Sequence, residues 1–455
     1  MRTYNIILYV FASMILFSCK KNWIEVRSNK NLDVPNTTAD FQALMDNVGI
    51  MNDNHPQMGE VSADNYYISY TTWQTWASLF RNAYVWEKDI YNNTVSDPPN
   101  WNNPYRAAFY ANIVLDGIDK VAPEELNSAA WNNAKGSALF YRAESFFNVS
   151  QLYANPYSLT FPDQQGIPLR LNADPNAVSV RANLQDTYSR VMNDLLGAVD
   201  FLPNIPLYKS RPSKPAAYAL LARYYLVKQD YANALNYADL CLKLYDSLLD
   251  YNTLNAAATY PIPPINKEVI YQATLQEEPL FNTVFVDSNL YKSYDNNDVR
   301  KKVFFKVNTS GQATFSGNYT GGTASSISKA FGGIATDEVY LTRAECYART
   351  GNITAALNDM NKLMATRWKA GAFVQYTPAN TSDVLALVLR ERRKETPFRG
   401  LRWLDLRRLN SDGANITLTR NLNGQQYTLT PNDPRYTLPI PPDVIALSGM
   451  TQNER

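Results

Sequence analysis

"ALLARYYLVKQDYANALNYADLCLKLY" (residues 219–245) has the same pattern as "EVYLTRAECYARTGNITAALNDMNKLM" (residues 338–364). Five positions match when the stretches are aligned: Ala222 with Ala344, Tyr225 with Tyr347, Asp230 with Asn352, Ala234 with Ala356, and Ala238 with Met360. Small residues let two antiparallel helices approach closely, and an aromatic residue one turn later fills the groove beside them. This spacing is typical of the tetratricopeptide repeat, a helix-turn-helix unit of about 34 residues. Such units bury their apolar faces only by stacking, so the sequence predicts a mostly α-helical, tetratricopeptide-like scaffold.

Two further stretches predict long helices. In residues 183–203, apolar side chains recur at spacings of three and four, which places them on one helix face. Asn183 and Asp186 form a plausible N-cap pair, and Pro203 ends the helix. Residues 134–153, "AKGSALFYRAESFFNVSQLY", are apolar on nearly every side, so we expect this helix at the centre of the protein.

The regions between these helices differ in composition. Residues 50–110 are rich in Asn, Trp and Tyr, and residues 250–335 contain Pro, Gly, Ser and Asn with scattered aromatic residues. Long loops in compact proteins are usually functional or disordered, and the aromatic content here favours function. We therefore divide the chain after the N-terminus into a helical part at 36–249, a loop-rich insertion at 250–335 and a second helical part at 336–455.

The N-terminus has the features of a lipoprotein signal peptide. Residues 6–17 form an apolar run that is too short to span a bilayer, which needs about 20 residues, but has the length of a signal-peptide core. Leu16 and Ser18 precede Cys19 as in the bacterial lipobox, in which the cysteine becomes lipid-modified. We expect a signal peptide at 1–18, a lipidated tether at 19–35 and attachment to outer-membrane lipid through Cys19. The alternative is an ordinary signal peptide with a chance cysteine.

Composition excludes some functions. The net charge of the 455 residues is +1, and no run of Lys and Arg is present, so nucleic-acid binding is not expected. No later stretch is long and apolar enough for a transmembrane helix. Cys241 and Cys346 lie inside helical patterns, and we interpret both as small buried residues.

Motifs for catalysis are missing. The single histidine, His55, precedes Pro56 in a polar loop and is interpreted as a surface residue. No metal-binding, nucleotide-binding or nucleophile motif is present, so we expect neither cofactor nor metal. Glu391 and Glu395 lie one helical turn apart and could form the carboxylate pair of a glycosidase. Their basic neighbours in "RERRKE" favour salt bridges along a helix face instead.

The chain as a whole resembles the SusD/RagB family of outer-membrane nutrient-binding lipoproteins. Besides the lipobox, matching stretches follow in order: "NWIEVRSNKNLDVPNTTADFQALMDN" (22–47), "AKGSALFYRAESFFNVSQLY" (134–153), "GIPLRLN" (166–172), "RPSKPAAYALLARYYL" (211–226), "DEVYLTRAECYARTGN" (337–352), "LRERRKETPFRGLRWLDLRRLN" (389–410) and "YTLPIPPDVI" (436–445). The resemblance implies a helical scaffold with a loop-rich face and no catalytic activity. It also implies a SusC-like TonB-dependent transporter as partner, and an oligosaccharide or, in some branches, a peptide as ligand.

One feature departs from the family pattern. Lys20 and Lys21 follow Cys19, whereas surface-exported members often have acidic residues there. The resemblance implies the outer membrane of a Gram-negative bacterium and surface exposure, and the two lysines leave the face of that membrane open.

Candidate ligand residues come from the two loop-rich regions. A neutral glycan is bound by stacking on aromatic rings and by hydrogen bonds from polar side chains. Residues 66–110 have over twice the aromatic fraction of the whole chain, which is 13%. We expect Phe80, Phe109 and Tyr110 to pack in the core. The candidates for stacking or hydrogen bonding are Asp64, Asn65, Trp73, Trp76, Tyr84 and Trp86 in the first region, and Tyr291, Tyr294, Phe315 and Tyr319 in the second.

Three functions therefore stay open. The first is a non-catalytic, lipid-anchored oligosaccharide-binding protein of an uptake system, with peptides as the variant ligand. The second is a secreted glycoside hydrolase with an α-helical core, which would place a carboxylate pair in the aromatic cleft. The third is a tetratricopeptide scaffold that binds only protein, in which the aromatic loops would be packed.

Overall fold

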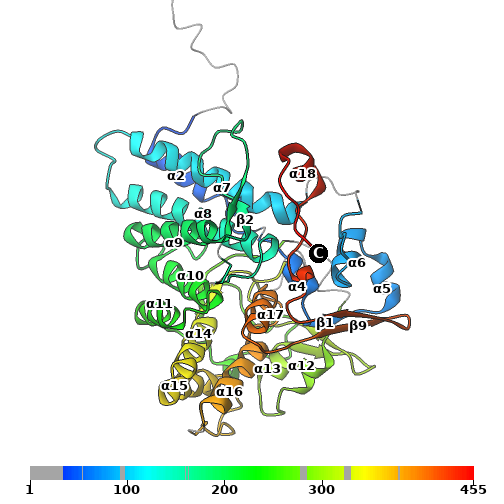
Figure 1. Cartoon of the computed structure of the whole chain (residues 1–455). Coiled ribbons are helices and arrows are strands. Elements are labelled where there is room, and N and C mark those ends of the chain that lie inside the picture. The colour runs from blue at the N-terminus through cyan, green and yellow to red at the C-terminus, as the bar shows by residue number, and fades with distance from the viewer. Residues whose placement is uncertain are drawn as a thin grey trace, which may run out of the picture. The chain divides into compact units, whose positions relative to one another are not determined.

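Eight helices of the described chain pack against one another in chain order and form the helical scaffold (Figure 1). In the computed structural model, the described residues are 34–53, 55–92, 98–158, 160–161, 163–276, 284–321, 329–377 and 380–455. Contacts lead from α7 to α8, α9, α10, α11 and α14, and α14 contacts α15 and α16. The bounds are α7 (Pro99–Gly117), α8 (Ala129–Tyr153), α9 (Leu184–Phe201), α10 (Lys214–Val227), α11 (Tyr231–Leu244), α14 (Thr336–Arg349), α15 (Ile353–Ala365) and α16 (Thr381–Glu395). The predicted mostly α-helical fold is confirmed.

The chain divides into two units, Met1–Asn36 and Thr37–Arg455. The boundaries expected near residues 250 and 335 both fall inside the second unit. The predicted signal peptide at 1–18 and Cys19 lie outside the described residues, as does the tether up to residue 33.

Both predicted repeats are helix-turn-helix pairs, α10–α11 and α14–α15. Their turns have the same conformation, since Gln229 and Gly351 both have positive φ angles of 59° and 85°. In each repeat the next residue caps the second helix: the side chain of Asp230 accepts a hydrogen bond from Asn233 N, and Asn352 accepts one from Ala355 N. Such caps satisfy amide groups that the helix itself leaves free, so the repeat is specified locally.

The two other predicted helices also form where the sequence places them. Asn183 caps α9 by accepting a hydrogen bond from the amide of Asp186, and α9 ends two residues before Pro203. Helix α8 begins after its N-cap Ser128 and is buried over most of its length between α7 and α9. Its central position explains why its sequence is apolar on nearly every side.

Short elements complete the first part of the chain. The helices are α2 (Thr38–Met45), α3 (Val48–Met51), α4 (Met58–Ser62), α5 (Tyr70–Thr75), α6 (Ser78–Tyr84) and the 3-10 helix η3 (Ile118–Lys120). Helix α2 packs on α7 and α8, and Phe41 of α2 fills the space over Gly117 of α7, where any β-carbon would clash with its ring.

The loop-rich regions contain only small antiparallel sheets within the described residues. The strand pairs are β1 (Tyr66–Tyr67) with β5 (Phe285–Val286), β2 (Gln165–Pro168) with β3 (Arg181–Asn183), β4 (Val269–Tyr271) with β8 (Ile334–Ala335), β6 (Phe305–Val307) with β7 (Ala313–Phe315), and β9 (Leu418–Leu422) with β10 (Gln425–Leu429). The remaining helices are η4 (Tyr251–Thr253), α12 (Ser288–Lys292), α13 (Arg300–Val303), α17 (Arg402–Ser411), η5 (Pro434–Tyr436) and α18 (Pro442–Ser448). The β1–β5 pair joins the two regions in which ligand residues were expected.

The cysteines lie in the scaffold, as predicted. Cys241 on α11 and Cys346 on α14 have no exposed surface and are both free thiols. Burial raises the pKa of both thiols well above the ordinary range. They therefore behave as small apolar residues between packed helices.

A network of buried charges connects the C-terminal helices to the loop-rich part. Arg300 Nη1 lies 2.8 Å from Glu395 Oε2, and its Nη2 lies 2.7 Å from Asp298 and 2.5 Å from Glu391. Arg367 Nε lies 2.7 Å from the other oxygen of Glu395. The side chains of Arg300, Arg367, Asp298 and Glu395 have no exposed surface. Every buried guanidinium of this network is thus matched to carboxylates.

A second cluster joins α14, α16 and α17. Asp405 of α17 accepts hydrogen bonds from Arg392 at 2.9 Å and from Arg408 at 2.8 Å, and Arg408 also binds both oxygens of Glu345. These contacts fix α17 against the repeats, since all four side chains are buried.

Candidate functional site

Six of the ten predicted ligand residues are buried and line none of the described pockets. Their exposed fractions are Asn65 1%, Trp76 6%, Tyr84 2%, Trp86 1%, Tyr294 2% and Tyr319 1%. The abundance of aromatic residues in these regions is therefore explained, for these positions, by packing inside the protein. The structure therefore corrects the expected ligand role of these six side chains to a structural one.

The packing partner of two of these rings is a buried arginine. The Arg420 guanidinium lies 3.5 Å from the ring centre of Tyr84 and 4.8 Å from that of Trp86. It also donates to the carbonyl groups of Val61 and Ala63. A guanidinium over aromatic faces is stabilised by cation–π attraction, so these rings fold the segment around Arg420.

Three of the other four buried residues have polar partners inside the protein, whereas the ring of Trp76 packs against Tyr66 and Tyr84. The Tyr294 hydroxyl donates to the carbonyl of Lys394 at 2.6 Å, and the Tyr319 hydroxyl donates to Glu268 at 2.5 Å. The amide of Asn65 donates to Glu60 at 2.5 Å. The polar groups of Tyr294, Tyr319 and Asn65 are thus already satisfied, which is the condition for burying them.

Asp64 lies on the surface but is bound by two arginines. Its oxygens are 2.7 Å from Arg402 Nε and 3.2 Å from Arg393 Nη2. Burial alone would raise the pKa of the Asp64 carboxyl, but the two guanidinium charges outweigh burial and hold the pKa far below its usual range. Asp64 lines a polar cleft of about 410 Å³, together with residues that include Asn289 and Thr419.

The remaining three predicted residues are half-buried. The ring of Trp73 stacks on the exposed ring of Tyr70 with 5.7 Å between centres, and its Nε1 donates to the carbonyl of Arg81. Tyr291 lies with its edge against Phe305, while Phe315 stacks on Phe398 at 4.6 Å. Of the three, Trp73 belongs to an exposed aromatic pair, so it is best placed to meet a ligand.

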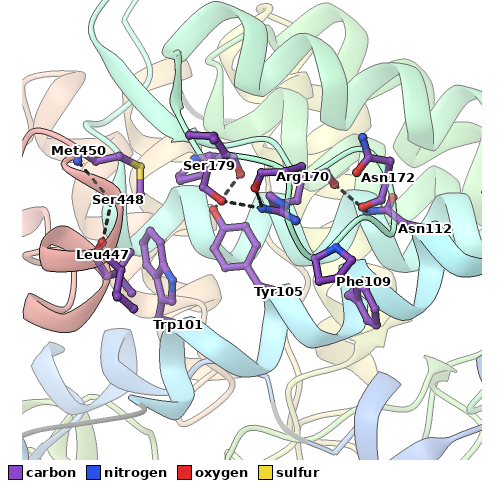
Figure 2. Close-up of a pocket in the computed structure, with 15 residues that line it drawn as sticks. Trp101, Tyr105, Phe109, Asn112, Arg170, Asn172, Ser179, Leu447, Ser448 and Met450 are labelled. Carbon is purple, nitrogen blue, oxygen red and sulfur yellow. Dashed lines mark hydrogen bonds between the residues drawn. The ribbon is translucent and has the colours of Figure 1, made fainter.

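An open groove of about 570 Å³ lies along α7 (Figure 2). Trp101, Tyr105 and Phe109 point into it from one face of α7, because residues four apart lie above one another on a helix. Residues of α18 and the segment after it, including Leu447 and Met450, close one end. We call this cavity the α7 groove.

The wall opposite α7 is a loop that an arginine holds in place. Arg170 donates to Ser179 Oγ at 2.9 Å and to the backbone carbonyls of Asp174 and Ala177. Asn112 Nδ2 donates to the carbonyls of Arg170 and Asn172 at 2.8 and 3.1 Å. These bonds fix a polar edge on the side of the groove opposite Trp101, Tyr105 and Phe109, which we call the aromatic ladder.

Tyr105 links the floor of the α7 groove to its wall. Its hydroxyl donates to the carbonyl of Pro168 at 2.9 Å, and burial raises its pKa well above the ordinary range. The residue therefore stays neutral, and only its ring is available for contact.

The expectation of core packing for Phe109 is wrong. Phe109 is 37% exposed and lines the α7 groove, whereas Phe80 and Tyr110 are half-buried against the core. The spacing of Trp101, Tyr105 and Phe109 is a signal that could have found the groove floor. No local pattern indicates its opposite wall, which comes from distant parts of the chain.

The two residues considered for catalysis have structural partners. Glu391 and Glu395 are 2% and 0% exposed and bind buried arginines, so they are not open to a substrate. The side chain of His55 is 12% exposed, and its Nε2 lies 3.4 Å from Glu144, which corrects the expected surface position. Within the described residues, no group of three His, Cys, Asp or Glu side chains could hold a metal ion.

Two protein-family models match different parts of the chain. A model described as "Starch-binding associating with outer membrane" matches residues 22–226, and a model of the SusD family matches residues 288–455. The chain belongs to the SusD/RagB family. The two matches include the aromatic ladder of α7 and the C-terminal segment that closes the groove.

Solved SusD-type structures have the same fold. A putative sugar-binding protein from Bacteroides vulgatus is 20% identical, with a TM-score of 0.74, and the match covers 92% of this chain and 99% of that one. A SusD superfamily protein from Bacteroides thetaiotaomicron is 21% identical, with a TM-score of 0.74 and coverage of 92% and 100%. A SusD-like carbohydrate-binding protein from Bacteroides vulgatus is 18% identical, with a TM-score of 0.68 and coverage of 91% and 97%. No curated protein matches the sequence.

Across the described residues, no helix combines the length and hydrophobicity needed to cross a bilayer.

Proposed function

We propose that this SusD-family protein binds an oligosaccharide without catalysis at the cell surface and delivers it to a SusC-like TonB-dependent transporter. Family membership supports the proposal, and two similar structures are named as sugar-binding and carbohydrate-binding proteins. The proposed location is the outer membrane, with Cys19 as the lipid anchor. Acylation with two or three chains would hold the protein stably, because each buried CH₂ group contributes about 0.8 kcal/mol.

The observation that best supports oligosaccharide binding is the α7 groove. It combines aromatic rings on one side with a fixed polar edge on the other, and sugars have an apolar CH face and a polar rim. The rings of Trp101 and Tyr105 are held by packing, and Phe109 is exposed at the open end. Trp73, Tyr291, Phe315 and Asp64 stay candidates for contacts outside the groove.

The test is a glycan array followed by calorimetry with the strongest binder. Substituting Phe109 by Ala removes an exposed stacking surface, and we expect about 5- to 10-fold weaker binding, equivalent to about 1–1.4 kcal/mol. Thermal stability should hardly change, since Phe109 is 37% exposed. The control is Tyr208→Ala, because Tyr208 is 63% exposed and does not line the groove. Equal affinity in both variants would rule out the α7 groove as the site.

The alternatives give different results in the same assays. A hydrolase would release reducing sugar from the bound glycan, and a protein-binding scaffold would bind no member of the array. Purification of the native outer-membrane complex tests the partner, and its recovery without a SusC-like transporter would contradict the proposed delivery. Palmitate labelling tests the anchor, and label retained by Cys19→Ala would contradict it.

A further inference from the structure

A further pocket, of about 780 Å³, has Gln165 of β2 and Arg181 of β3 in its lining. Its walls come from residues 155–158, 161 and 163–165, the C-terminal end of α17, and residues 432–437 and 451–454. Two arginines line it, Arg181 of β3 and Arg407 of α17. We call it the arginine pocket.

Both arginines donate to backbone carbonyls at the C-terminal end of α8. Arg407 binds the carbonyls of Gln151 and Ala154, and Arg181 Nη2 lies 3.5 Å from the carbonyl of Tyr153. Arg181 also donates to the carbonyls of Gly166 and Thr451. The carbonyls of Gln151, Tyr153 and Ala154 have no partner within the helix, so the two arginines cap α8 from outside.

Among the residues that the structure describes, neither arginine has a carboxylate partner, and both donate only to backbone carbonyls. Arg407 is only 4% exposed, and its Nε has no hydrogen-bond partner in the protein. A helix C-terminus is equivalent to roughly half a negative charge, so it compensates only part of two guanidinium charges. The wall of the arginine pocket therefore has an excess of buried positive charge.

The contrast with Arg420 shows that this excess is not a general property of buried arginines. Arg420 also lacks a carboxylate partner among the described residues, but aromatic rings cover its faces and it lines none of the described pockets. Arg181 and Arg407 face an open cavity instead. In agreement with this, burial lowers the pKa of each of these two guanidinium groups to about 10.

Carboxylates are also present at the pocket. Asp433 is bound by Arg435 at 2.7 Å, and its charge is therefore already compensated. Asp163 and Glu454 are exposed, so water screens their charge. The buried side of the pocket is positive, and its negative charges lie at the solvent side.

We propose that the arginine pocket binds the anionic group of an acidic saccharide, either a uronate carboxylate or a sulfate ester. Arg181, which is half-buried, contacts the anion, and Arg407 adds charge from below. Neutral hydrogen-bonding groups around them suit sugar hydroxyls; they include Asn155, Gln164, Gln165 and Thr437. The half-buried ring of Tyr157 offers a stacking surface beside them. The proposal rests on oligosaccharide binding as the proposed function and specifies the class of sugar.

The experiment uses the whole protein and a set of matched probes. The probes are tetrasaccharides from pectin (uronate), from chondroitin sulfate (uronate with sulfate) and from neutral starch, the methyl ester of the pectin probe, and an acidic tetrapeptide. Calorimetry at 50 and 300 mM salt measures the affinity of each, and a glycan array extends the comparison of acidic with neutral members. The variant is Arg181→Gln, and the control is Arg190→Gln, which removes the same charge from the surface of α9.

We expect acidic glycans to bind more tightly than neutral ones and to lose affinity at high salt. Arg181→Gln should weaken the acidic probes by about 10- to 100-fold and leave neutral probes and the control unchanged. Loss with methyl esterification identifies the carboxylate, whereas retention only by the chondroitin probe identifies the sulfate. Arg181→Lys, which keeps the charge, should restore part of the salt-dependent affinity.

Three outcomes would overturn the proposal. Equal binding of acidic and neutral glycans would remove the need for an anion site, while leaving oligosaccharide binding intact. A lower melting temperature of Arg181→Gln with unchanged affinity for acidic probes would show that the arginine only caps α8. Preference for the acidic tetrapeptide over every saccharide would contradict both this proposal and the proposed function.

Discussion

Two pairs of arginines in this protein differ in what surrounds their charge. Arg300 and Arg367 connect the loop-rich part to the C-terminal helices, and Asp298, Glu391 and Glu395 approach them to within 2.5–2.8 Å. Arg181 and Arg407 line an open pocket and meet only backbone carbonyls. Carboxylates of the protein balance the charges of the first pair, whereas no carboxylate among the described residues pairs with the second.

The comparison separates charge that maintains the fold from charge that is available for binding. Removing one partner of a buried ion pair leaves the other charge uncompensated, which is strongly destabilising. Removing a guanidinium that binds only carbonyls leaves neutral groups that water can reach from the pocket. The two kinds of arginine should therefore respond differently to the same substitution.

The largest effect is expected at Arg367. Arg367→Gln removes the charge that Glu268 and Glu395 share, and we expect the free energy of unfolding to fall by about 3–5 kcal/mol. Urea denaturation measures it. Arg181→Gln is the matched variant, and its loss should be about 1 kcal/mol because only hydrogen bonds to carbonyls disappear. Equal losses in the two variants would break the distinction between the groups.

Acid unfolding tests whether the paired charges stabilise the protein. Burial opposes ionisation of Asp405, but Arg392 and Arg408 outweigh it and lower its pKa from 3.8 to about 2. Because the pKa is lower in the folded state, this contribution is complete above pH 4 and is lost as the pH falls toward 2. It amounts to about 2 kcal/mol.

Asp405→Asn isolates this contribution, since Asn has the same shape but no proton to gain. The difference in unfolding free energy between wild type and variant should shrink between pH 6 and pH 2.5. A difference that stays constant over this range would contradict an ionised Asp405 in the folded protein. Urea denaturation at both pH values provides the measurement.

A smaller effect is expected at Arg420, where aromatic rings replace carboxylates. Lys keeps the charge but has no planar group to stack on Tyr84. It also cannot donate hydrogen bonds from two nitrogen atoms of one group, as the guanidinium does to Val61 and Ala63. We expect Arg420→Lys to lower the unfolding free energy by about 1–2 kcal/mol. An unchanged midpoint in urea would show that charge alone holds this segment.

The scaffold could be predicted from the sequence because its signals are local. The matching turns at Gln229 and Gly351 and the cap at Asn183 each depend on residues within one or two helical turns. The apolar residues on nearly every side of 134–153 also indicated the central position of α8. These features need no knowledge of distant parts of the chain.

The candidate binding surfaces could be predicted only in part, since their walls come from distant segments. Arg407 meets the carbonyl of Gln151 across 256 residues of sequence, and no local pattern indicates which arginine lacks a carboxylate. Aromatic abundance was equally ambiguous. Trp86 and Phe109 both lie in the aromatic-rich region, yet one is 1% exposed and the other 37%. Pro104 inside α7 further obscured the helix that aligns Trp101, Tyr105 and Phe109.

The burial of both scaffold cysteines has a practical consequence. Since Cys241 and Cys346 have no exposed surface and raised thiol pKa values, neither should react with a maleimide dye while the protein is folded. In a chain that begins after Cys19, one cysteine introduced at Val178, which is 81% exposed beside the α7 groove, would be the single site of attachment. We expect the brightness of a fluorophore attached there to change when a ligand enters the groove, so that binding at the proposed site could be followed in real time.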